Sequence, residues 1–288
     1  MKTKFYIGLL YILSSLSSGL LLAQTQASFH IPALYHVGFW VSDITKARRF
    51  YHDFLGYEEP YSLLTPQGDL QMVVMKVSEQ QVIYLFPNSK KILPNGDNLD
   101  HLGLITDNLS PLYQRMTLAG IKVKPVHKAR IGDLVLTCSD PDGHVFEITQ
   151  FETNGELMKH QGLCNSETRI SNALVSATLS VKDLDKSLQF YKTILGFKIK
   201  HINVGYDALI SVPDGSDTLH LIQTKSTERA LLDYKLEALD ITKANAILHR
   251  RASTLGFAIE EIKVNSSVTE IRCKDQNGTI VVIAEKSL

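Results

Sequence analysis

Cysteine is scarce in this chain of 288 residues, which has only Cys138, Cys164 and Cys273. Three cysteines are too few for a disulfide framework, and their spacing excludes a zinc ribbon or a CxxC redox motif. An excess of charge of one sign is also absent, because 30 Lys and Arg side chains balance 30 Asp and Glu side chains. Because the chain lacks a disulfide framework, we expect an apolar core to stabilise the fold. Because balanced charges create no global positive field, we expect no nucleic-acid partner.

Long hydrophobic runs are absent except near the N-terminus. Residues 5–22 are uncharged and mostly apolar, follow a basic start and lead into a polar Gln-Thr-Gln sequence. A secretory signal peptide has this pattern. We predict a signal peptide over residues 1–27, cleaved after Ala23 or Ala27, and an exported protein, periplasmic or extracellular. An uncleaved membrane anchor is the alternative, because the run is about as long as a bilayer span.

An internal repeat organises the rest of the chain. The segment Val41–Gly56, V-S-D-I-T-K-A-R-R-F-Y-H-D-F-L-G, returns 140 residues later as Val181–Gly196, V-K-D-L-D-K-S-L-Q-F-Y-K-T-I-L-G. A second pair, Cys138–Gly143 and Cys273–Gly278, recurs at an offset of 135 residues. Matches of this length indicate two homologous domains.

We place the first domain at residues 30–154, a linker at 155–169 and the second domain at 170–288. A fainter repeat lies inside the first domain, where Tyr35–Asp43 is echoed by Asp100–Asp107. Each domain is therefore expected to consist of two similar modules.

The first module has strand and helix signals in a fixed order. Residues 34–41 are rich in β-branched and aromatic residues and predict a strand. Asp43 is placed to cap a helix that Gly56 ends, and its apolar residues recur at helical spacing. Residues 71–77 and 81–86 predict two further strands, which gives a β-α-β-β order.

The second module repeats this order. Residues 99–106 predict a strand, Ser110 and Pro111 open a helix, and Gly120 closes it. Three further strands are predicted at residues 121–125, 134–138 and 145–151.

These residues resemble the vicinal oxygen chelate superfamily, which includes glyoxalase I, extradiol ring-cleavage dioxygenases and bleomycin-binding proteins. The resemblance rests on H-V-G-F-W-V-S-D, starting at His36, and on D-P-D-G-H-V-F-E, starting at Asp140. It implies an α+β fold of two tandem domains, each built from paired βαβββ modules that form a half-open sheet cup. It also implies that a divalent metal ion sits inside a cup.

Alternation along the first strand places His36, Gly38 and Trp40 on one face. The other face is expected to carry Tyr35, Val37, Phe39 and Val41. By the same parity, His101 shares a face with Gly103 in the second module.

His36, His101 and Glu147 match the metal-ligand positions of the superfamily. Two imidazoles and one carboxylate form a facial triad that leaves up to three positions for water, substrate or dioxygen. The alternative for each histidine is an ordinary buried or surface residue. His144 precedes Glu147 by three residues, is expected on the other face, and is not included.

We take two residues as catalytic candidates, His127 from the resemblance and Tyr84 because we expect it to line the cup and shape an aromatic or apolar ligand. His127 lies near the position of the dioxygenase acid–base histidine, whereas Thr137 stands where a tyrosine is expected. The fourth ligand position of glyoxalase I-like enzymes falls near Val82–Tyr84, where this chain has no carboxylate. The alternatives are a solvated loop for His127 and a core aromatic for Tyr84.

The second domain is expected to have lost the ligands. By the repeat alignment, Ser176 stands where His36 does, Tyr234 or Lys235 where His101 does, and Val282 where Glu147 does. We therefore expect a structural or substrate-covering role for this domain.

The functional expectation is an exported enzyme that binds two adjacent oxygens of a small-molecule substrate on one divalent metal, most similar to extradiol dioxygenases. Fe(II) or Mn(II) is favoured, with Zn(II) or Ni(II) as alternatives. A glyoxalase-like lyase or isomerase and a non-catalytic, drug-sequestering protein are the alternative functions. We expect a monomer or homodimer with no membrane contact beyond the signal segment.

Overall fold

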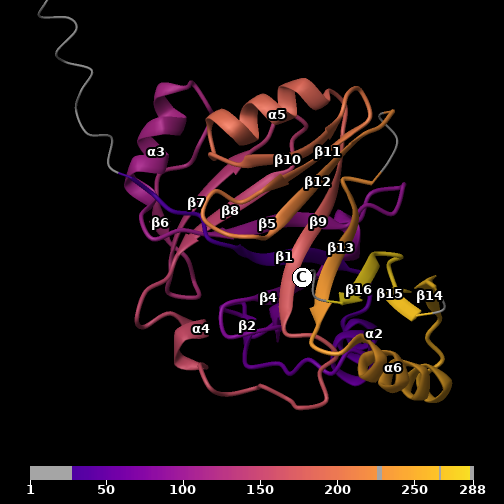
Figure 1. Cartoon of the computed structure of the whole chain (residues 1–288). Helices are drawn as coiled ribbons and strands as arrows, with labels where there is room; N and C mark the ends of the chain where they lie inside the picture. Colours follow the sequence, from indigo (N-terminus) through magenta and orange to yellow (C-terminus); the bar gives the residue numbers. More distant parts are fainter. Residues whose placement is uncertain (1–27, 226–228, 266, 286–288) are drawn as a thin grey trace, which may run out of the picture.

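Two eight-stranded sheets form the body of the protein (Figure 1). The computed structural model describes residues 28–225, 229–265 and 267–285. The predicted signal peptide at residues 1–27 lies outside these ranges. Within them, no helix combines the length and the apolarity needed to cross a bilayer.

The first sheet has the strand order β2-β3-β4-β1-β5-β8-β7-β6 and the second the order β10-β11-β12-β9-β13-β16-β15-β14. The first consists of β1 Leu34–Val41, β2 Ser62–Leu64, β3 Leu70–Lys76, β4 Val82–Pro87, β5 Leu99–Ile105, β6 His127–Lys128, β7 Leu134–Ser139 and β8 Val145–Gln150. The second consists of β9 Ala173–Val181, β10 Lys198–Asn203, β11 Asp207–Ser211, β12 Thr218–Gln223, β13 Leu231–Ala238, β14 Ile259–Val264, β15 Ser267–Lys274 and β16 Ile280–Glu285.

Short helices connect these strands. They are α2 Ile44–Arg48, the π-helix η1 Arg49–Phe54, the 3-10 helix η2 Ser89–Lys91, α3 Leu109–Leu118, α4 Glu156–Lys159, α5 Leu184–Thr193 and α6 Ile241–Leu255. Figure 1 shows α3 close to α5 at one end of the molecule and α2 close to α6 at the other.

Each sheet is a pair of related modules. In the first sheet, the central strands β1 and β5 are antiparallel, β4 pairs in parallel with β1, and β8 pairs in parallel with β5. The second sheet repeats this arrangement with β9, β12, β13 and β16. The predicted α+β fold of two tandem domains with paired modules is therefore confirmed.

Local sequence signals correctly predicted the positions of most helices and strands. Asp43 caps α2 as predicted, because its carboxylate accepts hydrogen bonds from the backbone N–H groups of Thr45 and Lys46. The strand predicted at residues 121–125 is not formed. That segment has one backbone bond to β7, from Lys124 N–H to the Thr137 carbonyl at 3.5 Å, and Pro125 has no N–H to donate.

The two sheets share one apolar core. Val37 and Phe39 of β1 point into this core together with Leu179 of β9 and Tyr234 of β13. The rings of Phe39 and Tyr234 lie 5.6 Å apart between centroids. The opposite, concave face of each sheet is left for a cavity.

A β-bulge alters the predicted alternation at the start of β1. The pairing of β1 with β5 shifts register between Leu34 and Val37. Tyr35 consequently lies with Tyr84 on the concave side, beside His36, and not in the shared core. The prediction that Tyr35 shares a face with Val37 was wrong, because a bulge places two successive side chains on the same side.

The repeated sequence motifs meet across the domain boundary. Tyr191 of α5 donates a hydrogen bond to Asp140 in the β7–β8 turn at 2.8 Å. Tyr51 of η1 donates to Asp275 in the β15–β16 turn at 3.4 Å. Each tyrosine belongs to one repeat and each aspartate to the other, so the motifs dock the domains reciprocally.

The same two turns form a second reciprocal contact. Asp142 Oδ1 accepts from the backbone N–H of Lys182 at 3.0 Å. Asn277 Oδ1 accepts from the Ser42 hydroxyl at 2.8 Å. Ser42 and Lys182 are themselves equivalent, since they follow the last residues of β1 and β9.

Candidate metal centre

Three side chains from three strands meet on the concave face of the first sheet. His36 of β1, His101 of β5 and Glu147 of β8 each offer one ligand atom, and these atoms lie within 4.8 Å of one another. The two imidazole centroids are 4.6 Å apart. The structure thus brings together the three side chains that the sequence singled out as ligands.

The nitrogens of these histidines lack protein partners. His36 is completely buried, and neither Nδ1 nor Nε2 has a hydrogen-bond partner among the described residues. Burial, with a smaller contribution from His101, holds the pKa of His36 well below its usual value. A neutral imidazole with a free lone pair is the form that binds a divalent metal.

Asp100 orients His101 from outside the site. Its Oδ2 lies 2.6 Å from Nδ1 of His101, which leaves the buried Nε2 without a partner. A carboxylate on the second nitrogen of a metal-binding histidine fixes the tautomer and the ring orientation. The sequence analysis did not assign this role to Asp100, although it immediately precedes His101.

Two glycines make room for the imidazole rings. A Cβ at Gly103 would overlap the ring of His36, and a Cβ at Gly38 would lie 3.1 Å from Cε1 of His101. Each module therefore has a His-x-Gly sequence in which the histidine of one strand lies over the glycine of the other. This reciprocal pairing could have been sought in the sequence, because both tripeptides are visible there.

Tyr84 occupies the module position equivalent to that of Glu147. Gly38 of β1 pairs with Tyr84 of β4, just as Gly103 of β5 pairs with Glu147 of β8. The Tyr84 ring lies 4.3 Å from that of His36 between centroids, and its hydroxyl is 2.9 Å from the Tyr35 hydroxyl. A buried phenol thus stands where the repeat could have placed a second carboxylate as a fourth ligand.

Two of the candidate ligands, His101 and Glu147, border a cavity of about 330 Å³, which we call the first cup, and the buried His36 lies behind them. The lining of the first cup is mostly apolar. It comprises Leu63, Gln71, Met72, Tyr84, Phe86, Asp100, His101, Ala129, Arg130, Ile131, Thr137, Val145 and Glu147. Arg130 reaches across to β2, where its Nη2 donates to the Leu64 carbonyl at 2.5 Å.

The two predicted catalytic residues differ in position. Tyr84 lines the first cup, whereas His127 is exposed on β6 and is not among the lining residues. The Nδ1 atom of His127 is 3.1 Å from the carbonyl of Pro125. Thr137, which pairs with Glu147, occupies the wall of the cup.

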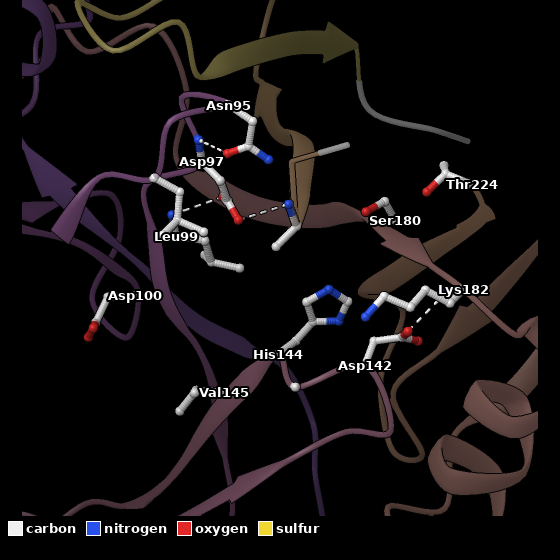
Figure 2. Close-up of a pocket in the computed structure, with 13 residues that line it drawn as sticks. Asn95, Asp97, Leu99, Asp100, Asp142, His144, Val145, Ser180, Lys182 and Thr224 are labelled. Carbon is white, nitrogen blue, oxygen red and sulfur yellow. Dashed lines mark hydrogen bonds between the residues drawn. The ribbon is translucent and has the colours of Figure 1, made fainter. Parts of the chain in front are cut away.

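His144 belongs to a separate cavity of about 390 Å³ between the domains (Figure 2). Its Nδ1 is 2.7 Å from Asp140 Oδ2, the oxygen that also accepts from Tyr191. Figure 2 shows Asp142 with Lys182 beside it, and Asp100 at the far edge. Asp100 therefore lies between this cavity and the first cup, since it lines both.

Strand registers refine the comparison with the second domain. Thr178 is equivalent to Gly38, and it pairs with Asp233 just as Gly38 pairs with His101. Asp233, and not Tyr234 or Lys235, therefore takes the position of His101, because the two repeats differ in length before this strand. Tyr234 is instead buried in the shared core.

Comparisons with known proteins agree with this fold. The family model of the Glyoxalase/Bleomycin resistance protein/Dioxygenase superfamily matches residues 33–148 and 173–278. No curated protein sequence matches the chain significantly.

Several solved structures share the architecture. An Mn(II)-bound glyoxalase from Novosphingobium aromaticivorans is 16% identical, with a TM-score of 0.67 over 90% of this chain and 83% of that one. A variant of homoprotocatechuate 2,3-dioxygenase from Brevibacterium fuscum is 15% identical, with a TM-score of 0.69 over 91% and 74%. A halotolerant catechol dioxygenase is also 15% identical, with a TM-score of 0.65 over 89% and 87%. At these identities the similarity concerns the fold.

Proposed function

Because the chain belongs to the Glyoxalase/Bleomycin resistance protein/Dioxygenase superfamily, we propose that its first cup holds one divalent metal ion and binds a small substrate through two adjacent oxygens. His36, His101 and Glu147 are the proposed ligands. Export is part of the proposal and rests on the sequence of residues 1–27 alone. If the protein is exported, it should be recovered outside the cytoplasm, and N-terminal sequencing should show that the mature chain begins after residue 23 or 27.

One observation carries the proposal. His36 is buried beside His101 and Glu147, and neither of its ring nitrogens has a hydrogen-bond partner among the described residues. Buried polar atoms without a partner destabilise a fold by about 1–3 kcal/mol each. A divalent ion fits this donor set, because neutral imidazoles and a carboxylate are ligands that such ions accept.

The surrounding residues have distinct roles in this proposal. Asp100 holds the ring of His101 with Nε2 available, while Met72 and Ile131 give the cup apolar walls. Arg130 at the lining attracts an anionic group of the substrate. When bound, the divalent ion supplies Lewis acidity toward two adjacent substrate oxygens.

Extradiol ring cleavage is the reaction we favour. Tyr84 takes the position equivalent to that of Glu147, so the site offers three protein ligands and leaves up to three metal positions for substrate and dioxygen. A glyoxalase-like reaction is the second candidate and is supported by the structural similarity to a glyoxalase. Metal-free capture of a small molecule is the remaining alternative.

Oxygen consumption by the metal-reconstituted protein in the presence of catechols tests the reaction class. We expect consumption by the wild type, none by Glu147→Gln, and an unchanged rate for the matched control Ser176→Ala in the second domain. Turnover of 2-oxoaldehydes without oxygen would instead favour the glyoxalase-like reaction. If the protein holds metal but shows neither oxygen consumption nor turnover of 2-oxoaldehydes, that result would contradict the proposal of an enzyme.

A further inference from the structure

The second domain also has a cavity on the concave face of its sheet, which we call the second cup. Its volume is about 670 Å³, twice that of the first cup. It is lined by Ala173, Val175, Ser176, Thr178, Leu209, Ser216, Asp217, Thr218, His220, Asp233, Lys235, Glu237, Glu270, Arg272, Val282, Ala284 and Glu285. The second cup exposes polar and apolar surface in nearly equal parts, whereas the first is mostly apolar.

The second cup is at the position that corresponds to the candidate metal centre. Ser176 is equivalent to His36, Asp233 to His101 and Val282 to Glu147. His220 takes the position of Tyr84, because it pairs with Thr178 as Tyr84 pairs with Gly38. Loss of two imidazoles removed the metal-ligand set, but the concave space remained.

Hydroxyl and carboxylate groups form the floor of the second cup. Thr178 donates to Asp233 Oδ1 at 2.7 Å, and Thr218 donates to the Ser176 hydroxyl at 2.8 Å. Ser211 pairs with Thr218 across β11 and β12, so its side chain lies on the same face. The Ser211 hydroxyl is fully buried and has no hydrogen-bond partner among the described residues. Ser211 is not itself a lining residue, so the hydroxyls that this floor presents to a polar molecule are those of Ser176, Thr178 and Thr218.

The charges of the lining are unbalanced. Five carboxylates line the second cup, against two permanent cations, Lys235 and Arg272. Both cations pair with the same carboxylate, that of Glu270, at 2.7 Å and 3.4 Å. Neither Lys235 nor Arg272 pairs with Asp233 or Glu237. Because carboxylates outnumber cations in the lining, the cavity has a net negative charge.

Asp217 and Glu237 both line the second cup, and they are near enough that the charge of Glu237 acts on Asp217. Asp217 Oδ2 accepts a hydrogen bond from the backbone N–H of Leu34 at 2.9 Å. Burial, together with the nearby charge of Glu237, raises the pKa of Asp217 to about 7. A positively charged group between these carboxylates would relieve their repulsion.

We propose that the second cup binds a small organic amine, with its ammonium group beside Asp217 and Glu237 and its polar groups toward Asp233 and the hydroxyl floor. The size of the cavity, the hydroxyl floor and the unbalanced carboxylates favour this class over apolar or anionic ligands. The site is independent of the candidate metal centre, because none of its lining residues belongs to the first cup.

Isothermal titration calorimetry with 1,4-diaminobutane, and with butane-1,4-diol as the neutral probe of equal length, tests the ligand class. We expect one diamine site per chain and no heat from the diol. Asp233→Asn and Glu237→Gln should each weaken the diamine affinity about tenfold or more, since each removes a charged partner. The control Glu260→Gln, at an exposed position on β14, should leave the affinity unchanged.

Two further measurements keep the test independent of variant folding and of the metal proposal. Amide shifts in β9, β12 and β13 of the wild type should change when the diamine is added. Glu147→Gln should bind the diamine as the wild type does. No binding of the diamine, or equal binding of the diol, would overturn the ligand class. Unchanged affinity in both second-cup variants, or loss in Glu147→Gln, would overturn the location.

Discussion

At the scale of single residues, the candidate metal centre depends on glycines as much as on ligands. Gly103 leaves the space that the ring of His36 occupies, and Gly38 does the same less tightly for His101. Alanine at Gly103 and alanine at Gly38 should therefore disturb the candidate metal centre to different degrees, although the two positions are equivalent.

We expect Gly103→Ala to displace His36 and to lower the free energy of unfolding by about 1–3 kcal/mol, as overpacking does elsewhere. Gly38→Ala should cost less, because its Cβ would meet His101 at 3.1 Å. Urea denaturation of both variants, with metal content measured in parallel, checks this order. Equal stability and equal metal content in Gly103→Ala and the wild type would contradict the packing described for His36.

Asp100 provides a second test at this scale. Asp100→Asn should weaken metal affinity by about 10- to 100-fold, because it removes the carboxylate that orients His101. The matched control is Asp69→Asn, at an exposed turn position of the same domain. Competition with a chelator measures both affinities. If the two variants hold metal equally well, Asp100 has no positioning role.

The sequence located the two histidines and Glu147 because repeat-equivalent positions and a family resemblance pointed to them. It did not locate Asp100, since a hydrogen bond to Nδ1 depends on side-chain direction and not on spacing. Similarly, the alignment alone misplaced the counterpart of His101, whereas the pairing of Thr178 with Asp233 assigns it.

At the scale of elements, alternation and capping predicted most strands and helices but not their irregularities. The bulge in β1 moves Tyr35 to the concave face, and η1 replaces a regular helix where α5 of the second domain stays α-helical. Both lie at contacts between segments that are distant in the sequence. For instance, Phe54 of η1 contacts Phe257, which follows α6.

The loop between β11 and β12 holds the start of β1 through Asp217, and this contact predicts a pH dependence. The pKa of Asp217 is about 7 in the fold and 3.8 in its ordinary state. As pH rises, Asp217 therefore loses its proton in the unfolded chain at a lower pH than in the folded protein. The free energy of unfolding falls as pH rises from about 4 to about 7. Above pH 7 the destabilisation is complete and constant.

Asp217→Asn should remove this effect, because an amide oxygen still accepts from the Leu34 N–H but carries no charge. We expect the variant to exceed the wild type in free energy of unfolding by up to about 4 kcal/mol at pH 8, and by little at pH 4. Urea denaturation at pH 4, 6 and 8 measures the difference. A difference that does not grow between pH 4 and pH 8 would contradict the raised pKa.

At the scale of the whole molecule, the two domains behave as one body in this account. Their sheets share a continuous apolar core, and the repeated motifs dock reciprocally through Tyr51 with Asp275 and Tyr191 with Asp140. Sequence comparison identified these motifs as repeats. It could not show that they contact each other across the domain boundary, because that requires the relative placement of the domains.

Tyr191→Phe tests this docking. Loss of the hydroxyl leaves the buried Asp140 with one partner fewer, and we expect a loss of about 1.5–3 kcal/mol. Calorimetry should show a single transition in both proteins, shifted to lower temperature in the variant. Tyr206→Phe, at an exposed position of the second domain, is the control. Two separate transitions in the wild type would show that the domains unfold independently.

The most direct test of the central claim is elemental analysis of the reconstituted protein beside the double variant His36→Ala/His101→Ala. Ser176→Ala, at the position equivalent to His36 in the second domain, serves as control. We predict one divalent metal ion per chain in the wild type and in Ser176→Ala, and none in the double variant. No metal in the wild type, or an unchanged stoichiometry in the double variant, would contradict the candidate metal centre.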